Sequence, residues 1–319
     1  MAGEVTKLAA PAGPVEAAAK VVAAFAARRR LRAGAFIVTL YGDAVVPRGG
    51  LVWLGNVIEA CGQVGISETL VRTAVSRLVT GGHLLGLRAG RRSYYRLTPQ
   101  SHAAFQAAAE RIYGSDDLPA EEGWTLLALP EGVADEPARR ALATEGFGLI
   151  APGLAARPGL PPVLPEPLAG LGAIPFAGSL QQVGLPALQE RAQEAWGLAD
   201  LNRGYRAFLA LFQPLAACLK DGDGLGALDP ALALSARLLL VHEFRRSLLQ
   251  DPRLPTALLP ADWAGQRARR LFARLYLDLT PGAETALEAG FVDAKGHLRL
   301  DRKAFKRRLS ALELALASA

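Results

Sequence analysis

The sequence is poor in the residues that form disulfide frameworks and metal sites. Its 319 residues include two cysteines, Cys61 and Cys218, and four histidines. The cysteines lie far apart and predict no disulfide framework. The histidines have no metal-ligand spacing with one another or with the cysteines. We therefore expect neither a metal site nor a bound cofactor.

Long apolar runs are also missing. The best candidate for a membrane span, residues 231–241, is too short for a bilayer and contains Arg237. The N-terminus has no basic segment followed by an apolar one, which argues against secretion. Because 51% of the residues are hydrophobic and 21% are charged, the composition is that of a globular protein. These features predict a cytoplasmic protein of two or three domains without membrane contact.

Motifs of common enzymes are absent as well. The chain has no glycine-rich phosphate loop ending in Lys-Ser or Lys-Thr, no Gly-x-Ser-x-Gly and no dinucleotide fingerprint. Residues 221–224 resemble the start of a calcium loop. However, Leu225 and Leu232 occupy its fifth and twelfth positions, where oxygen ligands are required. We predict that the protein is not an enzyme.

Positive charge is concentrated in one part of the chain, although the net charge is only +6. Residues 28–97 contain eleven arginines and three acidic residues, a net charge of +8. Residues 98–169 contain four arginines and ten acidic residues, a net charge of −6. One module therefore suits a polyanion and the next does not. Chance clustering on a solvated face is the alternative.

Residues 53–97 have the pattern of a DNA-reading module. Residues 53–60 predict a helix, residues 62–65 a short turn, and Ser67 the N-cap of a second helix that ends at Gly81. An apolar stripe recurs along this second helix at spacings of three and four: Leu70, Val71, Ala74, Val75, Leu78 and Val79. Two helices joined by a short turn indicate a helix-turn-helix, and an ordinary amphipathic surface helix is the alternative.

The polar face of the second helix has the chemistry of a major-groove reader. Arginine donates two hydrogen bonds to guanine, and threonine offers a hydroxyl and a methyl group. A single acidic residue, Glu68, lies near this face. The DNA contacts that we predict from this helix are Thr69, Arg72, Thr73, Ser76 and Arg77.

A basic hairpin is predicted directly after this helix, over residues 84–97 with a tip at residues 88–91. The side chains expected on one face are Leu85, Leu87, Tyr95 and Leu97. An edge strand protected by charge is the alternative. Because the hairpin follows a helix pair in the most basic part of the chain, we interpret it as a wing. The predicted wing contacts to phosphate or the minor groove are Arg88, Arg91, Arg92, Tyr94 and Arg96.

The predicted fold class is α+β with several domains. The domains that we expect are a flexible N-terminal tail at 1–27, a winged helix-turn-helix domain at 28–114, an α+β middle domain with a proline-rich linker at 115–185, a helical domain at 186–290 and a helical extension at 291–319. The residues at 16–32 are compatible with a short helix. The middle domain rests on two predicted strands, at 124–129 and 147–150, around a helix at 137–144.

Several short motifs along the chain are those of a known family. In the N-terminal half they are AFIVTLYGD at 35–43, PRGG at 47–50, LVRTAV at 70–75 and GRRSYYRL at 90–97, followed by RIY at 111–113, GFG at 146–148 and PGL at 152–154. In the C-terminal half they are LVHEFRR at 240–246, DP at 251–252, LP at 254–255 and LPADW at 259–263. Together they closely resemble the PaaX family of bacterial repressors of phenylacetic acid degradation. His83 departs from the tryptophan usual in the family, and the basic segment after Gly290 matches no family motif.

This resemblance implies a homodimeric repressor that binds double-stranded operator DNA through its winged helix. It also implies a ferredoxin-like middle domain, a helical C-terminal domain and an acyl-CoA effector, phenylacetyl-CoA, that releases the repressor from DNA. A CoA-thioester-processing or nucleic-acid-cleaving enzyme that docks through a winged helix is the alternative. An architectural DNA binder without a ligand is a third possibility.

The effector contacts that we predict are His242, Arg245 and Arg246, which lie in a family-like motif and could meet phosphate. The alternative is that Glu243 and these arginines form structural ion pairs. Trp263 and Tyr205 are expected in the core rather than against an acyl group.

Overall fold

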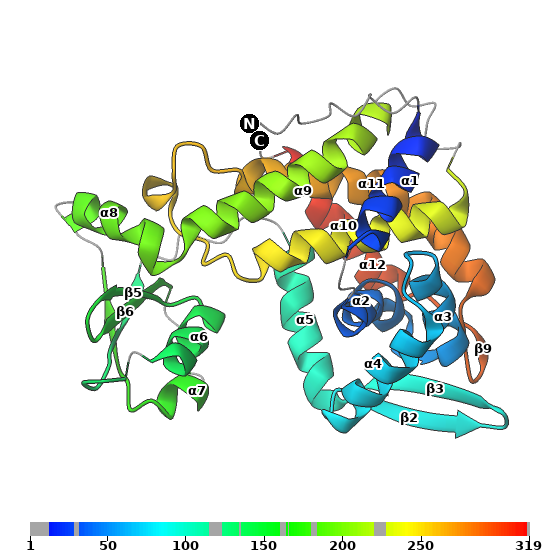
Figure 1. Cartoon of the computed structure of the whole chain (residues 1–319), viewed down its shortest axis with the longest axis horizontal. Coiled ribbons are helices and arrows are strands. Elements are labelled where there is room, and N and C mark those ends of the chain that lie inside the picture. The colour runs from blue at the N-terminus through cyan, green and yellow to red at the C-terminus, as the bar shows by residue number, and fades with distance from the viewer. Residues whose placement is uncertain are drawn as a thin grey trace, which may run out of the picture. The chain divides into compact units, whose positions relative to one another are not determined.

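The computed structural model describes residues 13–28, 32–114, 123–133, 135–159, 164, 166–179, 184–219 and 228–317. Within them the chain is a mixture of helices and small antiparallel sheets (Figure 1). It divides into two compact units. Unit 1 comprises Met1–Gly114, Phe208–Arg245 and Arg267–Ala319, and unit 2 comprises Ser115–Ala207 and Arg246–Gln266. No helix of the described residues is long and apolar enough to cross a membrane.

The N-terminal part of unit 1 contains most of the basic module. Its elements are α1 (Pro14–Ala26), α2 (Ala33–Leu40), the π-helical turn η1 (Tyr41–Val45), the 3-10 turn η2 (Val46–Arg48), β1 (Leu51–Trp53), α3 (Leu54–Gly62), α4 (Glu68–Thr80), β2 (Leu84–Ala89), β3 (Arg92–Leu97) and α5 (Pro99–Tyr113). The strands form an antiparallel sheet in the order β1-β3-β2. The sequence predicts Thr98 as the N-cap of a helix with Pro99 at its first position. Helix α5 begins in this way, and the Thr98 side chain accepts a hydrogen bond from the Ser101 amide.

Helix α1 corrects the prediction of a flexible tail over residues 1–27. Residues 14–26 form a regular helix, and Ala18, Val21 and Phe25 are buried. The physical reason is that alanine-rich segments favour helix and that these side chains repeat at spacings of three and four. Residues 1–12 of the predicted tail lie outside the described residues.

The C-terminal part of unit 1 is largely helical. Its elements are parts of α9 (Leu198–Leu219), α10 (Pro230–Leu248) and α11 (Gly265–Gly290), then β8 (Val292–Asp293), β9 (Gly296–His297) and α12 (Arg302–Ala317). Stacked aromatic rings mark its core, with 4.3 Å between the centroids of Phe244 and Phe272. From the sequence alone, a helix capped by Asp262 is predicted to end at Leu277. It instead continues through Pro281, because the buried Ala283 and Leu287 extend its apolar face.

A buried carboxylate, Asp43 in η1, joins the basic module to these helices. Four side chains donate hydrogen bonds to it: Tyr276 Oη at 2.8 Å, Tyr113 Oη at 2.9 Å, Arg237 Nε at 3.0 Å and Arg308 Nη1 at 3.4 Å. Burial by itself raises the pKa of Asp43, but the two arginines and the two hydroxyl groups outweigh burial, so the pKa lies below its ordinary value. Asp43 is therefore ionised at neutral pH and holds four segments of unit 1 together.

Unit 2 contains a four-stranded antiparallel sheet. Its elements are β4 (Trp124–Ala128), α6 (Glu136–Thr144), β5 (Gly148–Ala151), β6 (Leu154–Pro158), α7 (Glu166–Ala169), β7 (Ile174–Gly178), α8 (Leu185–Ala195), the first part of α9, and the 3-10 turn η5 (Thr256–Leu258). The strand order is β5-β6-β4-β7. The two faces of the sheet belong to separate apolar clusters, one around Trp124 and one around Leu127. The proline-rich linker was predicted over residues 157–175, and this prediction is partly wrong, because the end of β6, all of α7 and the start of β7 lie within it.

Candidate nucleic-acid interface

The turn between α3 and α4 fixes the angle between these two helices. The Ile66 amide donates to the Cys61 carbonyl at 3.0 Å, and Val64 and Ile66 are buried. Gly65 has a φ of +83°, and a Cβ atom there would lie 2.7 Å from the Cβ atom of Ala26. Glycine is therefore required twice, by its backbone conformation and by the close approach of α1.

Helix α4 has the expected bounds and exposes a row of hydroxyl groups. Val71 and Val75 are buried against the rest of unit 1. The residues opposite them, at spacings of four, three and four, are all exposed: Thr69, Thr73, Ser76 and Thr80. Arg72 and Arg77 are exposed beside this row, so the structure brings together all five contacts predicted on the helix.

Two details of α4 differ from the prediction. Leu70 and Val79 are 45% and 38% exposed, so they are not part of the buried stripe. The buried strip is narrower than predicted because only the side facing α2 and α3 is covered. Ser67 occupies the N-cap position with extended backbone, but its side chain makes no capping hydrogen bond.

Arg72 forms an ion pair with Glu68 one turn earlier on α4. Its Nη2 lies 2.6 Å from Glu68 Oε1, and both side chains are more than half exposed. An exposed pair at this spacing contributes only about 0.3–0.5 kcal/mol. The guanidinium group can therefore exchange this carboxylate for another acceptor at small cost.

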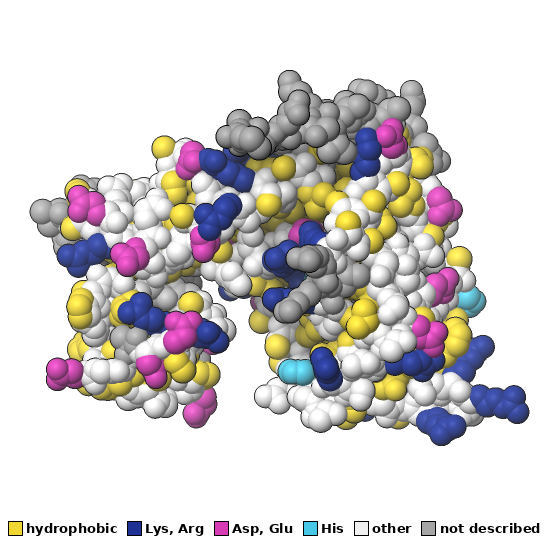
Figure 2. Space-filling model, in the orientation of Figure 1, with side chains coloured by type: hydrophobic (Ala, Val, Ile, Leu, Met, Phe, Trp, Pro, Cys, Tyr) yellow, Lys and Arg dark blue, Asp and Glu magenta, His cyan; other side chains and the backbone are white. Residues whose placement is uncertain are grey.

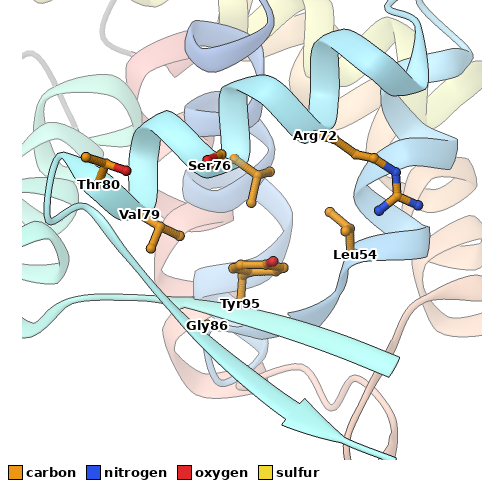
Figure 3. Close-up of a pocket in the computed structure, with 8 residues that line it drawn as sticks. Leu54, Arg72, Ser76, Val79, Thr80, Gly86 and Tyr95 are labelled. Carbon is orange, nitrogen blue, oxygen red and sulfur yellow. The ribbon is translucent and has the colours of Figure 1, made fainter. Parts of the chain in front are cut away.

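A groove of about 330 Å³ separates α4 from the β2–β3 hairpin (Figure 3). Its lining combines apolar and polar side chains: Leu54, Arg72, Val75, Ser76, Val79, Thr80, Gly86 and Tyr95. Gly86 lies opposite Tyr95 in the strand pair, and a Cβ atom there would be 3.3 Å from the Tyr95 ring. The glycine thus leaves room for the ring, which faces α4 and forms the base of the groove.

The β2–β3 hairpin has exposed arginines at its end. Its turn is Gly90–Arg91, where Gly90 has a φ of +59°. All four predicted wing arginines are exposed: Arg88, Arg91, Arg92 and Arg96. Figure 2 shows basic side chains gathered where this hairpin projects from unit 1. The hairpin therefore adds positive charge beside the polar face of α4.

The two faces of the hairpin are assigned differently from the prediction. Leu85 pairs with Arg96 and Leu87 with Tyr94, so the two leucines share a face with these residues rather than with Tyr95. Both leucines are exposed, at 41% and 47%. Tyr94 is only 5% exposed. The predicted contact by Tyr94 is corrected, because a side chain packed into the unit cannot reach a partner in this conformation.

Arg92 is held by a tryptophan that the sequence analysis did not single out. The Arg92 guanidinium carbon lies 4.6 Å from the centre of a Trp53 ring, a cation–π contact. A Cβ atom on Gly55 would lie 2.4 Å from the same indole. The indole is therefore packed between α3 and Arg92. The spacing of Trp53 and Gly55 is the only signal of this arrangement in the sequence.

The three predicted effector residues have different surroundings. His242 is buried, with its Nδ1 3.0 Å from Thr39 Oγ1 and its ring 5.4 Å from that of Phe25. It is a core residue, because a ligand could reach it only by displacing aromatic side chains. In unit 1, Arg245 is half-buried and its burial lowers the pKa. In unit 2, Arg246 is exposed.

Among the residues that the structure describes, no group of three or more histidine, cysteine or acidic side chains could hold a metal ion. The Asp-rich segment at 221–224 lies outside these residues. Of the two residues expected in the core, Tyr205 is buried as predicted and Trp263 is half-buried against an apolar cluster. Tyr205 is buried, with its hydroxyl 2.7 Å from Asp251 Oδ2, and its ring meets that of Trp263 at 5.6 Å.

Comparisons with known proteins match both ends of the chain. Residues 32–101 match the family model "PaaX-like protein", and residues 196–289 match "PaaX-like protein C-terminal domain". The transcriptional repressor PaaX of Escherichia coli (strain K12) is 36% identical over 269 residues, which cover 82% of this chain and 83% of that protein. A solved structure of an uncharacterized protein from Mycobacterium tuberculosis is 23% identical, with a TM-score of 0.43 over 72% of this chain and 89% of that one. The chain belongs to the PaaX family.

Proposed function

We propose that the protein is a DNA-binding transcriptional repressor in which α2 to β3 form a winged helix-turn-helix. The observation that carries this proposal is the exposed polar face of α4 beside a basic hairpin. The element order, with a short strand before the helix pair and a hairpin after it, supports a winged helix. The 36% identity to a transcriptional repressor supports the same function.

In this proposal α4 enters the major groove and the hairpin holds the backbone. Arg72 and Arg77 read base edges together with the hydroxyl row, because paired N–H groups match the O6 and N7 atoms of guanine. The exposed wing arginines contact phosphate or the minor groove: Arg88, Arg91, Arg92 and Arg96. The groove between α4 and the hairpin has an apolar base, which suits a thymine methyl group or a deoxyribose.

The test of this proposal compares two matched arginines. Arg72 pairs with Glu68, and Arg140 pairs with Glu136 in α6 at the same spacing and with similar exposure. Arg72→Ala should weaken binding to the promoter fragment by about 1–3 kcal/mol and reduce its preference over a scrambled duplex. Arg140→Ala should leave both unchanged. Equal affinities for the Arg72 variant and the parent protein would refute the placement of α4.

For unit 2 we propose a ferredoxin-like arrangement. Two observations support this arrangement. The strand order is β7-β4-β6-β5, and along the chain α6 connects β4 to β5 and α7 connects β6 to β7. The family resemblance supports a homodimer in the cytoplasm, with two copies of α4 in major grooves about 34 Å apart. It also supports control of an aromatic acid (phenylacetate) catabolic operon.

The effector that we propose is an acyl-CoA, with phenylacetyl-CoA as the first candidate. Of the three predicted contacts, Arg245 and Arg246 remain in the proposal and His242 does not, because it is buried. Adding the thioester, free phenylacetate and coenzyme A separately to the DNA complex tests this assignment. Release by the thioester alone is expected, and binding that ignores all three would refute it. We also propose that the protein is not an enzyme. No observation on the described residues favours the alternative, an enzyme that docks through a winged helix.

A further inference from the structure

The C-terminal hairpin β8–β9 lies beside the proposed DNA-binding module. Strand β8 follows α11 and contacts β1, the strand directly before α3. Its pairs are Val292 with His297 and Asp293 with Gly296, and the Lys295 amide donates to Asp293 Oδ1 at 2.6 Å. The hairpin thus presents Lys295 at a tight turn on unit 1. It lies beyond the residues that match the two family models.

A buried amide fixes this hairpin to α3. Asn56 is 2% exposed, and its Nδ2 donates to the Gly290 carbonyl at 2.9 Å. Its Oδ1 accepts from the Val292 amide at 2.9 Å. The base of the hairpin is closed by Phe291 and Leu298, both buried, with the Leu298 amide donating to the Phe291 carbonyl at 3.0 Å. Asn56 therefore positions the C-terminal hairpin against the module that carries α4.

The end of the hairpin is basic. Lys295, His297 and Arg299 are exposed, and no ion pair joins Lys295 or Arg299 to a carboxylate of the described residues. Residues 290–308 contain seven lysines and arginines against two acidic residues, a net charge of +5. An anchored hairpin with a lysine at its turn and an exposed arginine just beyond its base suits a polyanion such as the DNA backbone.

The position of the hairpin is compatible with the duplex that the wing would meet. Strand β8 contacts β1, and β1 pairs with β3, the strand that carries Arg92 and Arg96. The hairpin and these wing arginines therefore belong to neighbouring parts of one module. Phosphates follow one another every 3.4 Å of helix axis along a DNA strand, so one duplex offers several phosphates to such a module. The hairpin can therefore reach backbone adjacent to the wing contacts.

We propose that β8–β9 and Arg299 form a second phosphate-contacting arm of the DNA interface. The arm rests on the proposed DNA-binding function and extends it to a segment outside the family motifs. Lys295 and Arg299 neutralise backbone phosphates beside those met by β3, and Asn56 is the positioning residue that anchors them. Because phosphate contacts are independent of base sequence, the arm strengthens binding to every duplex and leaves base preference unchanged.

The test is the salt dependence of DNA binding by the full chain carrying Lys295→Gln and Arg299→Gln. The slope of log affinity against log salt should fall in magnitude by about 1.8, since each lost phosphate contact removes about 0.9. Between about 50 and 200 mM salt, affinity should then fall about twelvefold less than for the parent protein. The ratio of affinities for promoter and scrambled duplex should not change.

A matched control separates location from net charge. Arg140→Gln with Arg203→Gln removes two exposed cations from unit 2 and should leave the slope unchanged. If the Lys295 and Arg299 variant has the parent slope while Arg72→Ala still weakens binding, the second arm is refuted and the DNA-binding proposal stands. The second arm is also refuted if the unit 2 control lowers the slope as much. If the parent protein binds no DNA, both proposals fail.

Discussion

Replacing Trp53 by leucine should weaken DNA binding through Arg92 rather than through the fold. The indole packs against Gly55, and its ring centre lies 4.6 Å from the guanidinium carbon of Arg92. Leucine keeps an apolar side chain at this position but has no aromatic face. Arg92 would then keep its charge and lose the surface that orders it before DNA arrives.

The magnitude follows from the exposure of the contact. Arg92 is exposed, and an exposed cation–π contact contributes about 0.5–1 kcal/mol. If the whole of this free energy contributes to DNA binding, Trp53→Leu lowers the affinity by at most about fivefold. The salt dependence should not change, because no charge is lost. Arg92→Ala, in contrast, should reduce the salt slope by about 0.9.

A double-mutant cycle measures whether Trp53 acts through Arg92. Binding of a fluorescent promoter duplex is titrated for the parent, each single variant and the double variant at several salt concentrations. We expect Trp53→Leu to have no further effect once Arg92 is alanine. Equal losses in both backgrounds would show that Trp53 contributes only to the fold and would refute the positioning role. Trp53→Phe, which retains an aromatic face, should recover part of the affinity.

Two further predictions concern stability. Asp43→Asn should lower the free energy of unfolding by about 3–5 kcal/mol in urea titrations, because it removes the buried one of the two carboxylates that pair with the buried Arg237. Since the folded pKa of Asp43 lies below its ordinary value of 3.8, this stabilisation is present at neutral pH and is lost as the pH falls below about 4. The variant and parent should therefore converge in acid, and a constant difference at every pH would contradict the assignment. Gly65→Ala should destabilise the protein by about 1–3 kcal/mol from its positive φ alone, and an unchanged melting temperature would contradict the requirement for glycine at this turn.

The sequence predicted the elements that carry strong local signals. Thr98 and the following proline mark the start of α5, and the apolar period of α4 was enough to fix its bounds. Strand β1 was missed because three residues are too few to show alternation. Helix α11 was predicted too short because burial beyond Pro281 outweighs the local effect of proline.

The length of the turn in the β2–β3 hairpin determines which side chains share a face of the hairpin. A two-residue turn at Gly90–Arg91 pairs Ala89 with Arg92, which places Leu85 opposite Arg96. The predicted grouping of Leu85 with Tyr95 would need a turn with one residue more or fewer. The four predicted wing arginines are nevertheless exposed, because exposure depends on charge more than on register.

Contacts between distant segments could not be predicted from local patterns. The partners of Asp43 come from residues 113, 237, 276 and 308, and those of Asn56 from 290 and 292. Neither residue stands out by its neighbours, since one lies in an apolar segment and the other in a short helix. Only the fold brings these polar groups to their partners.

The most direct test of the central claim is a titration of the full chain onto its own promoter fragment and onto a scrambled duplex of the same length and composition. Measured at several salt concentrations, the affinity should be higher for the promoter and should fall steeply with salt for both duplexes. Equal affinity for the two duplexes would contradict base reading by α4. No measurable binding to either would contradict the DNA-binding function as a whole.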